Sequence, residues 1–360
     1  MEKAIMTGYL LSGSFDKPLL SKKRFIEQIG EIGLIEKISK KFLVDKQIVP
    51  VGAGEDDCAV IDVDKAKGGH KYLVATTDTV QESTHFPAGI SPFQIGWTSV
   101  AVNLSDIAAM GGHPFAFMVA MGIPAHTETA FVADVVEGIE KCASAYNTAV
   151  VGGDITKSKE LSLTGTCLGF ADKTVRRAGA KAGDLVCVTG SLGNAALGMK
   201  LIKKEMEAPK SVEEAAKMAL FQPMPRVKEG IMLAYSGLVT SMIDISDGLA
   251  LSLAELKKSS GVGFEIYEDK VPVLSEEIRS TGVFDRSMLD LRELAFFFGG
   301  DYELLFTVDA SENEELLKML KRKVKMSVIG KVVSAEEGIY FKTDEGKKEM
   351  MEIKGYRHFS

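Results

Sequence analysis

Cysteine is scarce in this chain, and its spacing offers neither a metal knuckle nor a disulfide framework. The 360 residues contain four cysteines, none of them in a Cys-x-x-Cys pair: Cys58, Cys142, Cys167 and Cys187. The five histidines include no His-Glu-x-x-His motif. These absences exclude the common zinc motifs and favour a reducing, cytoplasmic compartment.

The chain also lacks a long apolar run and an excess of positive charge. No stretch approaches the roughly 18 apolar residues of a membrane helix, and the mildly apolar start is flanked by Glu2 and Asp16, which is atypical of a signal peptide. The 50 acidic and 43 basic residues leave a formal net charge of −7, whereas a nucleic-acid-binding protein presents a basic face. We therefore expect a soluble protein with no membrane and no nucleic acid among its partners.

The familiar nucleotide-binding motifs are missing as well. There is no G-x-x-x-x-G-K-[S/T] loop and no protein-kinase His-Arg-Asp or Asp-Phe-Gly set. The loop Gly190-Ser191-Leu192-Gly193 lacks dinucleotide spacing and is more typical of a tight connection from strand to helix.

What is present is a regular mixture of helical and strand patterns, with 46% hydrophobic and 26% charged residues. Helices are predicted over residues 22–42, 94–110, 129–146, 225–235, 249–259 and 312–321, and one after Gly190. Strands are predicted over residues 48–51, 59–61, 72–75, 148–151, 161–170, 184–189, 263–266, 303–308 and 326–333. The polar stretch 172–177 suggests a boundary, so we expect an N-terminal extension (1–20) and two α+β domains (21–175 and 176–360).

Aspartates beside Gly, Ser or Thr recur where these strands are predicted to end. They are Asp57, Asp78, Asp154, Asp244 and Asp247, while Asp106 lies within the predicted helix 94–110. A single such aspartate often caps a helix or closes a turn. Several in one pocket would repel one another, by about 4 kcal/mol for two charges 4 Å apart at a dielectric constant near 20. The set therefore suggests bound Mg²⁺, which prefers oxygen ligands and finds its remaining partners in water and phosphate.

Taken in order, the motifs of this chain resemble those of the thiamine-monophosphate kinases. The superfamily also contains aminoimidazole ribonucleotide synthetase, selenophosphate synthetase and the hydrogenase maturation factor HypE. The resemblance runs from about Lys22 to Phe359. It rests on Asp56-Asp57-Cys58-Ala59-Val60, Thr76-Thr77-Asp78, His85-Phe86, Val102 to Gly111, Gly152-Gly153-Asp154, Arg177-Ala178-Gly179-Ala180, Gly183-Asp184, Gln222 to Arg226, Ile243 to Leu249, Asp301 to Leu304 and Gly355 to Phe359.

This resemblance implies an α+β fold of two mixed-sheet domains, with N-terminal domains that pair strands across a homodimer. It implies direct transfer of the γ-phosphoryl group of ATP to thiamine monophosphate, giving thiamine diphosphate, with more than one Mg²⁺ and no protein acid, base or nucleophile. The implied metal ligands are Asp57, Thr76, Thr77, Asp78, Asp106, Asp154, Asp244 and Asp247. The implied ATP contacts are Gly153, Asp154, Arg177 and Ser246, and the implied substrate contacts are His85 and Tyr356.

The chain departs from the family pattern at two places. The family usually has Gly-Gly-Glu-Asp-Tyr-Glu-Leu, and here Gly300 stands where that first Glu is expected to face the substrate. The first motif carries an additional Glu55, so that either Asp56 or Asp57 is the metal ligand; we favour Asp57.

Two other functions remain open from the sequence. One is another ATP-dependent activity of the superfamily, aminoimidazole ribonucleotide synthetase first. Selenophosphate synthetases carry a reactive residue near the N-terminus, and HypE ends in cysteine; this chain has neither feature. The other is a sensor that binds thiamine phosphates or nucleotide without turnover.

Overall fold

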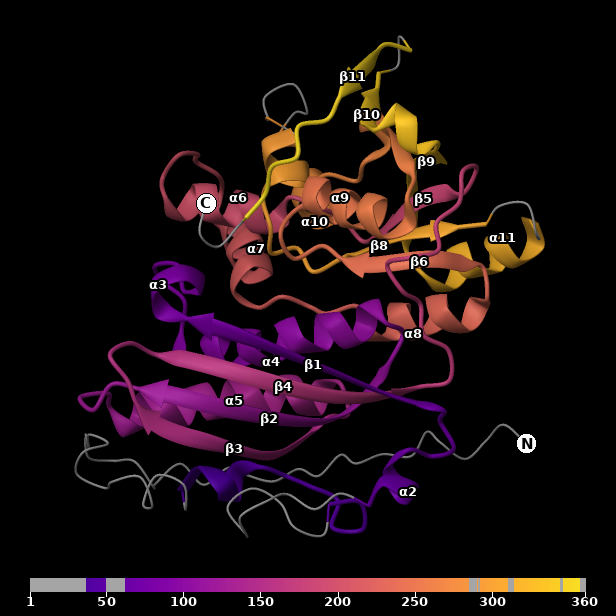
Figure 1. Cartoon of the computed structure of the whole chain (residues 1–360). Helices are drawn as coiled ribbons and strands as arrows, with labels where there is room; N and C mark the ends of the chain where they lie inside the picture. The colour runs from indigo at the N-terminus through magenta and orange to yellow at the C-terminus, as the bar shows by residue number, and fades with distance from the viewer. Residues whose placement is uncertain are drawn as a thin grey trace.

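The computed structural model describes residues 37–49, 62–284, 290, 292–309, 314–343 and 346–356. Two sheets, one above the other in Figure 1, organise these residues into two domains, which makes the fold α+β as expected. Within the described residues, no helix combines the length and hydrophobicity needed to cross a bilayer.

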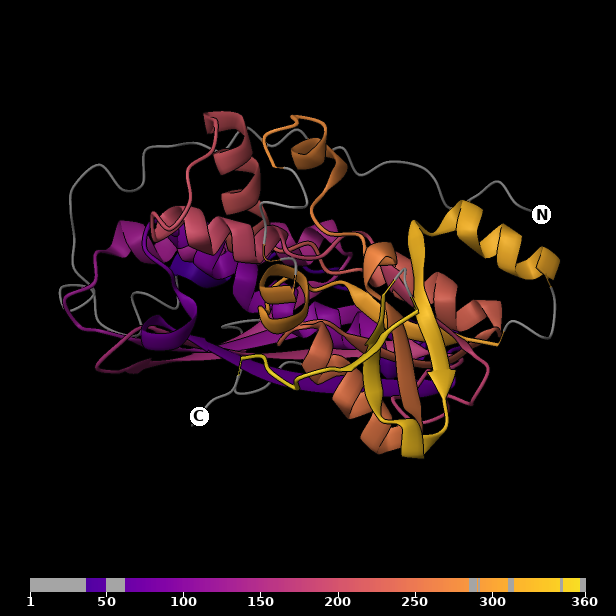
Figure 2. The same cartoon turned by 90° about the horizontal axis from the view of Figure 1, so that it is seen from above.

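The first domain is built on a mixed sheet of four described strands. In spatial order they are β1 (Tyr72–Gln81), β4 (Ser162–Ala171), β2 (His113–Ile123) and β3 (Ala149–Lys157). β2 and β3 run parallel, and the other neighbours run antiparallel. Helices α4 (Pro92–Ala109) and α5 (Thr129–Ala145) cover one face of the sheet, as the view from above shows (Figure 2). Among the described strands, β1 and β3 are therefore the two edges.

The second domain contains a larger mixed sheet, with seven strands among the described residues. Their order is β11 (Lys348–Met350), β10 (Ile339–Lys342), β7 (Gly263–Tyr267), β9 (Met326–Val333), β5 (Leu185–Thr189), β8 (Leu304–Val308) and β6 (Val239–Asp244). The edge strand β6 contacts α4 of the first domain.

The remaining helices surround these sheets. They are α2 (Val63–Ala66), α3 (Glu82–His85), α6 (Asn194–Ile202), α7 (Lys210–Phe221), α8 (Val227–Ser236), α9 (Leu249–Ser260), α10 (Glu276–Arg279) and α11 (Glu314–Lys323). A π-helical turn spans Glu293–Phe297.

Helix α4 is the central element of the molecule. It begins at a capping box, in which the Ser91 hydroxyl accepts from the Gln94 N–H and the Gln94 side chain accepts from the Ser91 N–H. Nearly all of its residues are buried because the sheet, α5, α8 and β6 surround it. Gly96 and Gly138 allow α4 and α5 to approach closely, since a Cβ at Gly96 would lie 1.8 Å from the Val135 carbonyl oxygen.

One hydrophobic cluster continues from the first domain into the second. It includes Leu104 and Phe117 from the first domain and Leu233 and Phe306 from the second, all of them fully buried. The two domains therefore share a hydrophobic core at the seam, which is the interface between the two sheets, and α4 lies within this core.

Several sequence predictions need correction. Ile48 is in a turn and Val49 has no regular structure, although both were predicted to be in a strand; the other residues of that strand, and residues 59–61, lie outside the described residues. So do the N-terminal extension and most of the predicted helix 22–42. Asp78 and Asp154 lie inside β1 and β3, because each strand continues several residues beyond its predicted end.

Candidate active site

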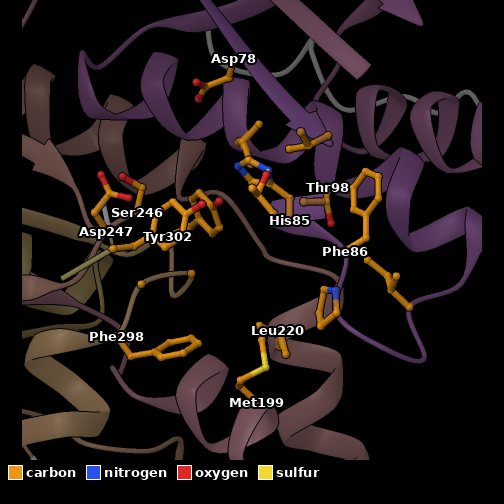
Figure 3. A pocket seen from close by; sticks show the side chains of 18 of the residues that line it. Asp78, His85, Phe86, Thr98, Met199, Leu220, Ser246, Asp247, Phe298 and Tyr302 are labelled. Carbon is orange, nitrogen blue, oxygen red and sulfur yellow. The ribbon is translucent and has the colours of Figure 1, made fainter. Parts of the chain in front are cut away.

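A cavity of about 960 Å³ lies between the two domains and collects most of the predicted site residues. The first domain contributes Asp78, His85 and Asp106, and the second contributes Asp244, Ser246, Asp247 and Tyr356. Figure 3 shows Asp78 on one side of the open space, facing Ser246 and Asp247 on the other. The two halves of the chain thus build one site together.

The last two turns of α4 position the acidic residues of the cavity. Asp106 accepts a hydrogen bond from the Thr76 hydroxyl at 2.5 Å, and the Asn103 side chain accepts from the Asp78 N–H at 3.1 Å. These two bonds fix β1 against the helix, so that Asp78 and Asp106 line the same cavity. Alternation along β1 then turns Thr77 to the opposite face, where its hydroxyl donates to the Gly165 carbonyl at 2.7 Å.

Asp244 brings a carboxylate from the second domain to the same place. It is the last residue of β6, and Ser105 of α4 donates to its Oδ2 at 2.7 Å. Burial, followed by the negative charge of Asp106, raises the pKa of Asp244 to about 7, against the opposing effect of the Ser105 bond. Burial also raises the pKa of Asp106. For both carboxylates burial is the main cause, and the Arg177 charge opposes the shift.

The described residues do not by themselves form a closed metal cage in this cavity. No three His, Cys, Asp or Glu side chains in that part of the chain converge closely enough to hold an ion by themselves. This open arrangement differs from a closed protein cage. It fits Mg²⁺, which usually takes one or two carboxylates and completes its coordination with water and phosphate oxygens. Asp57, the remaining predicted ligand of this group, lies outside the described residues.

A second cavity of about 210 Å³ adjoins the first. Asp106 and Asp244 line both, and Thr76 and Arg177 line the smaller one. The Arg177 guanidinium is half-exposed and lies 3.9 Å from Glu255, while its positive charge lowers the pKa values of Asp106 and Asp244. The second cavity is therefore the place where a cation of the protein meets the acidic cluster.

His85 and Tyr356 meet at the rim of the larger cavity although they are far apart in sequence. Their ring centroids are 6.4 Å apart, in an edge-on arrangement. The Tyr356 N–H donates to the Asp247 carbonyl, which places the C-terminal segment across the loop after β6. Beyond them the wall becomes apolar, with Phe86 at the right of Figure 3 and Met199, Leu220 and Phe298 in its lower part.

Two predicted ATP contacts are not brought to this site within one chain. Gly153 and Asp154 belong to β3, at the opposite edge of the sheet from β1. Asp154 pairs in register with Ala120, which pairs with Thr164, which pairs with Thr79. Asp154 therefore shares with Thr79 the face of the sheet opposite α4 and α5, roughly 14 Å away across three strand spacings.

Sequence reasoning did not identify Tyr302 or the two residues that flank it as site elements. Tyr302 lines the cavity with a φ of 50°, in the left-handed region that is rare for a bulky residue. Asp301 accepts from the N–H groups of Gly193 and Ala195, and Glu303 forms a two-point ion pair with Arg226. The Asp301-Tyr302-Glu303 motif is the sequence feature that could have identified Tyr302 as a site residue. Asp301 and Glu303 anchor Tyr302, whose backbone is strained and whose side chain lines the cavity.

Gly300, at the departure from the family pattern, lies on the cavity wall with a φ of 95°. A Cβ there would meet the Ala195 side chain at 3.4 Å and nothing nearer. The wall thus has room for a side chain at this position, but the positive φ favours glycine.

Two family models match the chain in succession. The N-terminal domain of AIR synthase related proteins matches residues 55–171, and the C-terminal domain of the same proteins matches residues 181–342. The chain is 36% identical over 307 residues to a thiamine-monophosphate kinase of Methanospirillum hungatei, a match that covers 84% of this chain and 92% of the relative. A thiamine-monophosphate kinase of Pyrococcus horikoshii is 36% identical over 287 residues, or 80% of this chain and 86% of the relative.

Solved structures give the same result. Thiamine-monophosphate kinase from Stenotrophomonas maltophilia superposes with a TM-score of 0.74 at 29% identity, covering 88% of this chain and 96% of that one. AaThiL complexed with AMPPCP and TMP superposes with a TM-score of 0.69 at 30% identity, covering 96% of this chain and 100% of that one. E. coli HypE, at 18% identity and a TM-score of 0.69, shares the fold.

Proposed function

The chain belongs to the thiamine-monophosphate kinase family, and we propose that it transfers the γ-phosphoryl group of ATP to thiamine monophosphate, forming thiamine diphosphate. The observation that carries this function is the cavity between the domains, where four aspartates from both halves face His85 and Tyr356. Homologues of the same name cover most of the chain, and one related structure was solved with AMPPCP and TMP.

The chemistry fits a site that lacks an obvious general base. The attacking atom is a phosphate oxygen, and a phosphomonoester with a second pKa near 6 is already mostly dianionic at pH 7. Phosphoryl transfer then depends on alignment of the two phosphates and on neutralisation of their charge. The protein holds the two reactants in line and keeps water out of the space between the domains.

Charge neutralisation is the proposed task of more than one Mg²⁺. The proposed ligands are Asp57, Thr76, Thr77, Asp78, Asp106, Asp154, Asp244 and Asp247. When bound, the ions would balance the carboxylates and the phosphate charges. The raised pKa values of Asp106 and Asp244 support this assignment, because both carboxylates are poorly compensated without a cation.

The proposed contacts assign different residues to the two substrates. Arg177 and Ser246, with Gly153 and Asp154, bind ATP; the guanidinium of Arg177 suits a phosphate because it offers paired N–H donors. His85 and Tyr356 bind thiamine monophosphate. The apolar wall near Phe86 and Phe298 supports this part of the cavity as the place for the aromatic rings of the substrate.

The working unit is proposed to be a homodimer in the cytoplasm. β1 and β3 are long edge strands, and exposed edges of this kind favour pairing with another chain. Pairing β3 of one copy with β1 of the other would bring Asp154 toward Thr77 and Asp78. The three described cysteines are free and buried, which agrees with a reducing compartment. We keep residues 21–175 and 176–360 as the proposed domain division.

One assay tests the function directly. The purified protein is incubated with ATP, Mg²⁺ and thiamine monophosphate, and thiamine diphosphate is followed by chromatography. Formation of thiamine diphosphate supports the proposal. Turnover of formylglycinamidine ribonucleotide in its place would assign the chain to aminoimidazole ribonucleotide synthetase, and binding without any turnover would make it a sensor.

A further inference from the structure

We propose that Ser105 is a positioning residue that holds Asp244 of the second domain in the orientation required for cation binding. This inference rests on the divalent-cation site proposed above. The Ser105 hydroxyl donates to Asp244 Oδ2 at 2.7 Å, across the seam between the domains. Ser105 is completely buried and Asp244 is 5% exposed, so solvent does not replace this bond readily.

The geometry of α4 explains why this position is suited to the task. At about 100° per residue, Asp106 projects between Asn103 and Ser105 around the helix. Asn103 holds the β1 backbone at Asp78, and Ser105 holds the carboxylate of β6. One turn of a rigid, buried helix therefore fixes the relative positions of carboxylates from both domains.

The hydrogen bond from Ser105 occupies only one of the two carboxylate oxygens of Asp244. It engages Oδ2 of Asp244, and the Ser252 hydroxyl donates to the main-chain oxygen of the same residue at 3.1 Å. Within the described residues, the hydrogen bond that the Asp244 carboxylate accepts comes from the Ser105 hydroxyl. The bond to Oδ2 leaves Oδ1 as the atom that Asp244 can offer to a cation in the cavities that it lines.

The test compares two serines of the same helix. Ser105→Ala removes the hydroxyl that reaches Asp244, and Ser99→Ala removes a buried hydroxyl that donates within the helix, to the Gly96 carbonyl at 2.8 Å. Alanine favours helix at both positions, so neither change should weaken α4 through propensity. Binding of Mn²⁺ to the full chain, without nucleotide, is measured by electron paramagnetic resonance beside the Mg²⁺ dependence of the kinase rate.

Ser105→Ala should raise the Mn²⁺ dissociation constant about 10-fold, the usual cost of losing a residue that orients a ligand, whereas Ser99→Ala should leave it unchanged. In an Asp244→Asn background the effect of Ser105→Ala should become much smaller. Ser105→Cys, which keeps the side-chain size and weakens the donor, should fall between wild type and alanine and replaces alanine if that variant does not fold.

Equal Mn²⁺ affinity in Ser105→Ala and Ser99→Ala would overturn the role of Ser105 while leaving the cation site and the kinase activity in place. An undiminished effect of Ser105→Ala in the Asp244→Asn background would also overturn it. If the wild-type chain bound no Mn²⁺, both the cation site and this inference would fail.

Discussion

Asp106 lines both cavities, its carboxylate is partly buried, and no ion pair joins it to a cation of the described residues. We predict that Asp106→Asn lowers the Mg²⁺-dependent rate by roughly 100-fold, equivalent to about 3 kcal/mol of transition-state stabilisation. The amide can still accept from Thr76, so the local structure should persist.

Stability provides the control for this variant. Burial raises the pKa of Asp106, so its charge opposes folding near pH 8 in the absence of metal. Asp106→Asn should therefore be at least as stable as the wild type in urea unfolding at that pH. A variant with wild-type kinase activity would contradict the assignment of Asp106 to the site.

His113 is a second residue whose charge state matters, at the far end of the first domain from α3. It stacks on His70 with centroids 4.9 Å apart, and its Nε2 is buried without a hydrogen-bond partner in the described part of the chain. Burial, and then the nearby His70, lowers its pKa below the ordinary value for histidine, while Asp172 acts in the other direction.

This shift predicts sensitivity to mild acid. The stabilising contribution of neutral His113 is complete above about pH 6.5, and it is lost as the pH falls through the lower folded-state pKa. The free energy of unfolding should thus decrease between pH 7 and pH 5, and His113→Phe should reduce that decrease. His126→Gln, in a loop, serves as the control. An identical pH profile for His113→Phe and wild type would refute this explanation.

At the scale of secondary-structure elements, α8 is tied to β8 by one buried ion pair. Arg226 donates to both carboxylate oxygens of Glu303, at 2.6 and 2.7 Å, and Thr189 donates to the same carboxylate. The Glu303 side chain is only 3% exposed, so its charge depends on Arg226.

Arg226→Ala should consequently lower the free energy of unfolding by about 3–5 kcal/mol, because it leaves a buried carboxylate unpaired. Lys217→Ala, which removes the Glu213–Lys217 pair on the surface of α7, should cost only about 0.5 kcal/mol. Urea unfolding of the two variants measures both values. Equal losses would show that Glu303 does not depend on Arg226.

The long helices are the elements that could be predicted best. The apolar periodicity predicted helices at 94–110, 129–146 and 249–259, and the structure confirms them as α4, α5 and α9 with ends that differ by at most two residues. β2 was not predicted, because Pro114 and Gly122 interrupt its apolar run and both of its faces are largely buried, which removes the alternation typical of a strand.

The ends of the strands that carry site residues were also difficult to predict from the sequence. The sequence predicted that β1 and β3 end just before their Thr, Gly and Asp residues, yet both strands continue through them, because edge strands tolerate polar side chains. The motifs predicted that Asp78, Asp106, Asp244 and Asp247 matter together, and they do line one cavity. Their convergence depends on α4 packing against both β1 and β6, a tertiary contact that no local pattern encodes.

At the scale of the whole molecule, the positions of Asp78 and Asp154 make the proposed homodimer testable by complementation. If Asp154 of one copy completes the site of the other, Asp78→Asn and Asp154→Asn chains are each inactive alone. Co-expression of the two chains should restore about a quarter of the wild-type activity, because half of randomly assembled dimers are mixed and each mixed dimer holds one intact site.

A matched pair of variants provides the control. Asp78→Asn combined with Asp106→Asn places both defects in residues that line one chain's cavity, so mixed dimers should gain no intact site. Recovery in that pair, or no recovery in the first, would show that Asp154 does not act across a dimer.

The hydrophobic cluster shared by the two domains has a consequence for how the chain folds during its synthesis. Leu104 and Phe306 are interior to the same cluster, so separating the halves would expose the interior of each. We therefore expect the halves matched by separate family models to stabilise each other and to unfold together. Synthesis of the first half must leave α4 incompletely buried until β6 and β8 emerge from the ribosome. The acidic site is assembled at that late moment, so a chain able to bind its nucleotide is one that has already finished folding.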